Sequence, residues 1–218
     1  MKKYFLTLCV LLATLPMWAQ APYACVTKGA VLEYASYNEE DKVENYSRQV
    51  IQDVTDLGGG NYDFRTSNSI ISEPGEKGDG ENTFVALGEV REGAAKIAIS
   101  GVDGSIDVSA SDPGITMLPN KLAVGYQLPI GDVRVSMDGL AVVATITDNE
   151  VIGREEVTVP AGKFKCYIVK QVTEVSMMGV SAITTTKTWY SRGVGIVKSE
   201  STMGNRLIGR QELVTFKK

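Results

Sequence analysis

The stretch GREEVTVPAGKFKCYIVK, residues 153–170, decides the fold class of the chain. Two runs rich in β-branched and aromatic residues flank the short turn PAGKF, and the second run continues to residue 178. Pro160 ends the first run because proline has no N–H for a central strand ladder. Gly162 supplies the backbone freedom that a tight turn often needs. The pattern therefore predicts a long β-hairpin.

Comparable strands continue on both sides of this hairpin. They are separated by glycine-rich or polar turns and cover residues 30–37, 43–57, 61–72, 83–90, 94–100, 105–109, 140–148, 151–159, 180–191, 196–202 and 206–216. Long runs with short turns are typical of an antiparallel meander. The stretch 118–135 holds two prolines and two glycines, which fits edge strands or a crossing loop.

One window, residues 43–57, allows two interpretations. As a strand it places Tyr46, Val50 and Val54 on one face at even spacing. Its apolar residues also recur at spacings of three and four, as in a helix. The β-branched content favours the strand.

About ten strands in one sheet would curl strongly or close on themselves. We therefore expect a mainly β protein: a single strongly curled antiparallel sheet or an open β-barrel, with at most a short helix or two. The chain shows no internal repeat and no linker, so residues 20–218 are interpreted as one β domain.

The N-terminus has the plan of a secretory signal peptide. Lys2 and Lys3 precede an apolar run over residues 4–15, Pro16 follows, and small residues stand at 19 and 21. The apolar run is shorter than the roughly 20 residues that span a membrane. We expect residues 1–19 to be removed after Ala19, with cleavage after Ala21 as the alternative, and the protein to act in the periplasm or cell envelope.

The charge of the predicted mature chain limits its partners. Loss of the two leader lysines changes the net charge from −4 to −6. No cluster of basic residues follows Lys3, whereas nucleic acid and anionic membranes attract basic patches. We expect no nucleic-acid partner and no membrane span after the leader is removed.

Two cysteines, Cys25 and Cys166, remain in the mature chain. An oxidising compartment and an even count predict a disulfide between them. Closing a loop of that length would contribute roughly 4–5 kcal/mol. The alternative is two separate buried thiols, because sequence does not show proximity.

The absence of histidine removes several chemistries. With no histidine in 218 residues, Ser–His–Asp and Cys–His catalysis and His-ligated zinc are excluded. No nucleophile-elbow, phosphate-loop or calcium-loop motif is present. A carboxylate-based hydrolase would need two opposed carboxylates, and the adjacent Glu155 and Glu156 point to opposite faces of a strand. We expect no catalytic residues, no metal and no cofactor.

The C-terminal half resembles a known family. Residues 153–170, TKTWYSRGVGIVKSES (186–201) and RQELVTF (210–216) resemble the TapB-like family of exported bacterial proteins of unknown function. The stretches GAVLEYASYN (29–38) and LPNKLAVGYQLP (118–129) look similar to the same family. The resemblance implies a YmcC-like fold, a curled antiparallel sheet related to lipoprotein carriers such as LolA and LolB, and it carries over no catalytic residue.

A binding function follows as the leading hypothesis. A curled sheet of this size can enclose an apolar cavity, so we expect a non-enzymatic carrier for a lipid-like ligand. The predicted cavity lining is Tyr46, Phe64, Phe164, Ile168 and Trp189. The alternative is a structural or assembly factor that contacts an envelope protein, in envelope or surface polysaccharide biogenesis.

Overall fold

A computed structural model describes residues 20–78, 83–91, 94–100, 106–110, 118–137, 140–177 and 180–218. These residues form strands and turns, and no helix occurs among them. The predicted leader, residues 1–19, lies outside the described residues. The strands are β1 (Val31–Tyr37), β2 (Val43–Gly58), β3 (Asn61–Ile71), β4 (Thr83–Arg91), β5 (Ala94–Ser100), β6 (Ile106–Ala110), β7 (Gly131–Met137), β8 (Leu140–Val159), β9 (Gly162–Met177), β10 (Val180–Ser191), β11 (Gly195–Met203) and β12 (Arg206–Lys217).

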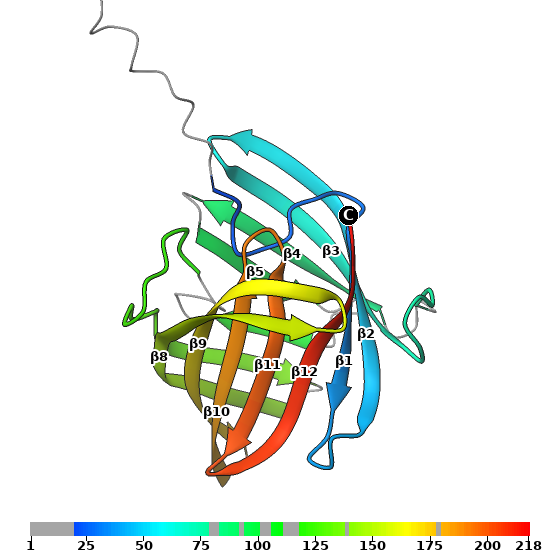
Figure 1. Cartoon of the computed structure of the whole chain (residues 1–218). Helices are drawn as coiled ribbons and strands as arrows, with labels where there is room; N and C mark the ends of the chain where they lie inside the picture. Colours follow the sequence, from blue (N-terminus) through cyan, green and yellow to red (C-terminus); the bar gives the residue numbers. More distant parts are fainter. Residues whose placement is uncertain are drawn as a thin grey trace, which may run out of the picture.

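All twelve strands belong to one antiparallel sheet with the order β5-β4-β3-β2-β1-β12-β11-β10-β9-β8-β7-β6. Every neighbouring pair except β1 and β12 is consecutive in the chain, so the sheet is a meander joined through its first and last strands. The sheet curls strongly (Figure 1), and its edge strands β5 and β6 are not hydrogen-bonded neighbours. The predicted fold class, a single curled antiparallel sheet or open barrel, is confirmed.

The structure decides two expectations about residues 43–57, their secondary structure and the face that their apolar residues share. The window 43–57 is a strand, β2, as its β-branched content favours. Its register on β3 shifts between Ile51 and Asp53. Because one extra residue reverses the alternation of side chains, Val54 lies on the opposite face from Tyr46 and Val50, and the predicted shared face is wrong.

The N-terminal segment, residues 20–29, shows which way the sheet curls. Tyr23 packs in one apolar cluster with Val169 of β9, while Ala24 packs in another with Phe64 of β3. The strand registers place Val169 and Phe64 on the same face of the sheet. Two adjacent residues reach both strands only if the sheet curls around them, so we call this face the inner face and the other the outer face.

Contacts at one end of the sheet hold the N-terminal segment in place. Gly193, in the β10–β11 turn, donates its N–H to Pro22 O over 2.7 Å. Arg192 donates to Ala21 O over 2.8 Å and to Asn120 Oδ1 over 2.6 Å. The segment passes beside this turn in Figure 1. One arginine thus ties two loops to the same end of the sheet.

The largest apolar cluster lies where the tip of the β8–β9 hairpin reaches β12. Ala161 N–H donates to Leu213 O over 3.2 Å, and Figure 1 shows the hairpin bending across to the last strand. Burying these side chains supplies most of the driving force for folding. The buried members are Cys25, Ala30, Leu32, Ile51, Val159, Cys166, Trp189, Val194, Val197 and Leu213.

Candidate functional site

The inner face carries a row of uncharged hydrogen-bonding side chains. Asn149, Gln171, Thr186 and Ser201 are direct cross-strand partners on β8, β9, β10 and β11. Directly paired residues share a face and lie within contact distance. The hydroxyls of Thr186 and Ser201 are 3.0 Å apart. We call these four residues the amide–hydroxyl row.

A second uncharged row follows on the inner face, one step closer to the N-terminal segment. Thr188, Ser199, Gln211 and Ser36 pair directly in turn across β10, β11, β12 and β1. Three of them are partly exposed and Thr188 is buried. The two rows therefore form one continuous surface of side-chain hydroxyls and amides. These groups can donate and accept hydrogen bonds without carrying a net charge.

The outer face of the same strands is charged. Glu150, Lys170, Lys187, Glu200 and Arg210 are direct cross-strand partners from β8 to β12. The first four are chain neighbours of residues in the amide–hydroxyl row. Arg210 is the chain neighbour of Gln211 in the second neutral row. Because successive side chains on a strand alternate between faces, the strand pattern separates charge from neutral polarity across the sheet.

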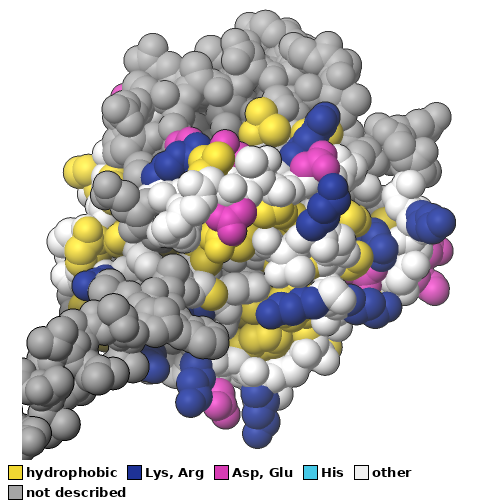
Figure 2. Space-filling model, turned by 90° about the horizontal axis from the view of Figure 1, so that it is seen from above, with side chains coloured by type: hydrophobic (Ala, Val, Ile, Leu, Met, Phe, Trp, Pro, Cys, Tyr) yellow, Lys and Arg dark blue, Asp and Glu magenta, His cyan; other side chains and the backbone are white. Residues whose placement is uncertain are grey.

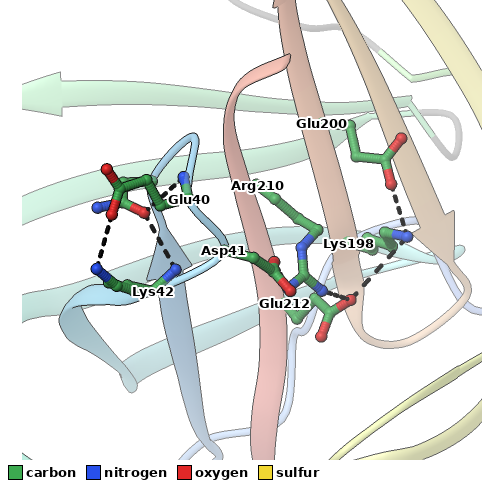
Figure 3. A network of polar contacts seen from close by, with 8 residues as sticks. Glu40, Asp41, Lys42, Lys198, Glu200, Arg210 and Glu212 are labelled. Atoms are coloured by element: carbon green, nitrogen blue, oxygen red, sulfur yellow. Dashed lines mark hydrogen bonds and ion pairs between the residues drawn. The ribbon is translucent and has the colours of Figure 1, made fainter.

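Ion pairs extend from this charged row toward the β1–β2 turn (Figure 3). Lys198 Nζ lies 2.7 Å from Glu200 Oε1 and 4.0 Å from Glu212 Oε1. Arg210 contacts Glu212 over 2.5 Å and also pairs with Asp41. Burial alone would lower the pKa of Arg210, but its bonds to Asp41 and Glu212 outweigh burial and raise it. Each carboxylate in this network is matched to a cation, an arrangement typical of structural pairing.

Trp189 lies at the end of this network. Its indole Nε1 donates to Glu155 Oε1 over 2.6 Å, and Lys198 Nζ lies 5.0 Å from the ring centroid. Trp189 is the direct partner of Ile168, and both pack with Phe164 in the largest apolar cluster. The structure thus brings together three of the five residues predicted to line a cavity.

The other two predicted lining residues lie elsewhere. Phe64 belongs to a separate apolar cluster with Ala24 and Val90 on the inner face. Tyr46 pairs with Ala35 on the outer face. By register, Ile168 and Trp189 share a face with Lys198. They nevertheless pack in the cluster that holds Leu32 and Ile51, which the register places on the inner face. The structure therefore brings Phe164, Ile168 and Trp189 together in the core and places Phe64 and Tyr46 elsewhere.

Cys25 and Cys166 are both buried and both free. They belong to the same apolar cluster, and this structure shows the alternative of two buried thiols in place of the predicted disulfide. Cys166 Sγ donates instead to Phe164 O over 3.6 Å. Burial raises the pKa of Cys25, and burial followed by the charge of Glu155 raises the pKa of Cys166 to about 12. Neither thiol has the lowered pKa of a reactive cysteine.

Two buried side-chain polar atoms, the Tyr23 hydroxyl oxygen and Asn149 Oδ1, have no hydrogen-bond partner in the described part of the molecule. Asn149 is 5% exposed, and its amide Nδ2 donates to Pro129 O over 2.9 Å. Its Oδ1 accepts no hydrogen bond in the described part of the molecule. An unsatisfied buried acceptor costs roughly 1–3 kcal/mol. The amide–hydroxyl row thus ends in an acceptor that lacks a donor.

The described residues contain no group of three or more acidic or cysteine side chains that could hold a metal ion. They also contain no helix able to cross a membrane. Seen from above (Figure 2), the surface mixes basic and acidic side chains with exposed apolar ones.

The two neutral rows were not predicted from the sequence, although the sequence carries a local pattern that points to them. The stretches TKT (186–188) and KSES (198–201) alternate hydroxyl and charged residues with a period of two. This alternation assigns each residue to a face. It does not reveal which hydroxyls on different strands are neighbours, because that depends on register.

The chain belongs to the DUF3108-like family, whose model matches residues 98–213, more than half of the sequence. Membership of the TapB-like family, which the sequence resembles, is not confirmed. No curated protein matches the chain.

Two solved structures share the fold. One is a Bacteroides fragilis NCTC 9343 protein described as exported and of YmcC-like fold, with a TM-score of 0.73 and 16% identity over 91% of this chain and 100% of that chain. The other is a Parabacteroides distasonis ATCC 8503 protein described as a lipoprotein, with a TM-score of 0.70 and 15% identity over 91% of this chain and 99% of that chain. At these identities the likeness concerns the fold alone, and the implied YmcC-like fold is confirmed.

Proposed function

We propose that this protein is an exported, non-enzymatic binding module of the cell envelope whose ligand lies against the inner face of the curled sheet. The observation that carries the proposal is the division between the two faces: neutral hydrogen-bonding side chains inside and paired charges outside. A partly exposed polar inner face provides directional contacts for a ligand. The leader pattern over residues 1–19 supports export.

The inner face also bears on the carrier hypothesis. Its apolar clusters sit at the end held by the N-terminal segment, where Tyr23 and Ala24 cover them. The partly exposed remainder carries the hydroxyls and amides of the two rows together with apolar side chains such as Val175 and Ala182. A lipid-like ligand lying over the two rows would leave their hydroxyls and amides without hydrogen bonds, which is unfavourable, so the acyl-carrier form of the hypothesis is the less favoured one.

Native mass spectrometry of protein recovered from its own envelope tests the proposal. Thr186→Arg puts a bulky charge on the inner face, and Thr185→Arg puts the same group on the outer face of the same strand. We expect a bound mass on the wild type and on Thr185→Arg, and its loss from Thr186→Arg. Equal occupancy in all three proteins, or no bound mass on any, would contradict the proposal. The protein mass should also correspond to a chain beginning at Gln20.

A second candidate, an assembly factor, has one observation in its favour. Val124, Tyr126 and Ile130 are large apolar side chains exposed on one short segment, and exposed apolar groups that cluster mark interaction surfaces. Photo-crosslinking in the native envelope from position 126 should then yield a defined protein adduct, whereas the same crosslinker at exposed position 158 should not. Identical adduct patterns from both positions would remove this candidate.

A further inference from the structure

The chemistry of the inner face narrows the ligand class, provided that the proposed binding function holds. Eight direct cross-strand partners form the two neutral rows, and none of them carries a charge. Lys170, Lys187 and Glu200 stand on these same strands but point to the outer face. A charged ligand lying on the two rows would therefore find no countercharge among their side chains, and desolvating an unpaired ion is expensive.

The side chains that remain suit a ligand with many hydroxyls. Hydroxyl and amide groups can both donate and accept, as sugar hydroxyls do. The rows repeat such groups at strand spacing, about 4.8 Å from one strand to the next. A linear chain of hydroxyl-bearing units lying across β8–β11 along the amide–hydroxyl row meets one polar side chain per strand.

The unsatisfied Oδ1 of Asn149 is an independent observation. Its own amide donates to Pro129 O, and no donor in the described part of the molecule reaches the oxygen. Gln171, its direct partner on the inner face, is partly exposed and lies between Asn149 and Thr186. A ligand hydroxyl that displaces the Gln171 side chain would supply that donor.

We propose that the inner face binds an uncharged oligosaccharide across the amide–hydroxyl row, with Asn149, Gln171, Thr186 and Ser201 as the hydrogen-bonding residues. Binding rests on neutral hydrogen bonds and excludes acidic sugars, because none of the eight residues of the two rows is a cation. It is independent of ionic strength, unlike recognition by charge.

Isothermal titration calorimetry with defined probes tests this ligand class. The neutral probes are maltohexaose, cellohexaose and chitohexaose, the acidic probe is hexagalacturonate, and the apolar probe is palmitate. We expect at least one neutral hexamer to bind, with an affinity unchanged between low and high salt, and hexagalacturonate and palmitate not to bind. Thr186→Val should weaken binding about fivefold, as expected for one lost neutral hydrogen bond.

Thr185→Val is the matched control, since it makes the same change on the adjacent outer-face residue and should leave affinity unchanged. If only hexagalacturonate or palmitate binds and Thr186→Arg abolishes that binding, the ligand class is wrong while the proposed binding function stands. If no probe binds and Thr186→Arg carries the same envelope-derived mass as the wild type, both proposals fail. If none of the neutral hexamers binds although Thr186→Arg removes an envelope-derived mass, the saccharide proposal alone is overturned.

Discussion

The indole N–H of Trp189 donates to Glu155 across β9, over 2.6 Å, although Trp189 is 6% exposed and Glu155 is exposed. This bond joins the buried end of β10 to the β8–β9 hairpin. It also gives the buried indole N–H a hydrogen-bond acceptor that it would otherwise lack. We expect Glu155→Ala to lower the free energy of unfolding by about 1 kcal/mol. Urea unfolding followed by tryptophan fluorescence measures this change, since the other tryptophan, Trp18, lies in the predicted leader.

Glu156→Ala is the control for this prediction, because Glu156 is also exposed and points to the other face of β8. It should leave both stability and the emission maximum of Trp189 unchanged. Equal stability losses from the two variants would show that hairpin charge, rather than the indole bond, is responsible.

The sequence predicted the sheet and its hairpins because strand alternation and turn residues are local signals. It failed at Val54, since the register shift after Ile51 depends on the partner strand β3. It also missed the amide–hydroxyl row for the same reason: Thr186 and Ser201 become neighbours only through pairing. Ile168 and Trp189 were predicted to line a cavity, and in the structure they pack in the largest apolar cluster.

The two thiols should be unreactive toward Ellman's reagent in the native protein at pH 8. Burial raises the pKa of both, that of Cys166 to about 12, so almost no thiolate is present. After unfolding without reductant, two thiols per mature chain should react. No reaction after unfolding would show that the disulfide predicted from the sequence forms in the envelope.

The raised pKa of Cys166 also gives stability a pH dependence. The pKa of the unfolded thiol is near 9, whereas that of the folded thiol is about 12. Between these values the unfolded chain binds fewer protons, so the free energy of unfolding falls as pH rises, by at most about 1.4 kcal/mol per pH unit. Urea unfolding at pH 8 to 11 should show a steeper decline for the wild type than for Cys166→Ala. Parallel declines would contradict the buried-thiol assignment.

Glu33 forms a buried pair with Arg48, and its carboxylate also accepts the N–H of Gly75 over 3.0 Å. Glu33 is 1% exposed, so its removal leaves a guanidinium and a backbone N–H without their acceptor. We expect Glu33→Ala to destabilise the protein by about 3 kcal/mol. The exposed Glu44→Ala serves as control and should change stability by less than about 0.5 kcal/mol. A similar small loss from Glu33→Ala would mean that water replaces the carboxylate.

Gly88 of β4 is the direct partner of Phe64 on β3, and a Cβ at position 88 would overlap the phenyl ring. We therefore expect Gly88→Ala to cost about 1–3 kcal/mol through overpacking. Phe64→Leu should also destabilise when made alone, because it removes buried aromatic surface. The double variant should be more stable than the sum of the two losses implies, since the smaller side chain makes room for the methyl group. Thermal unfolding of the three variants measures these changes. Gly209→Ala, whose Cβ would lie 3.7 Å from its nearest neighbour, is the control and should be tolerated. Strict additivity in the double variant would show that Phe64 does not pack over Gly88.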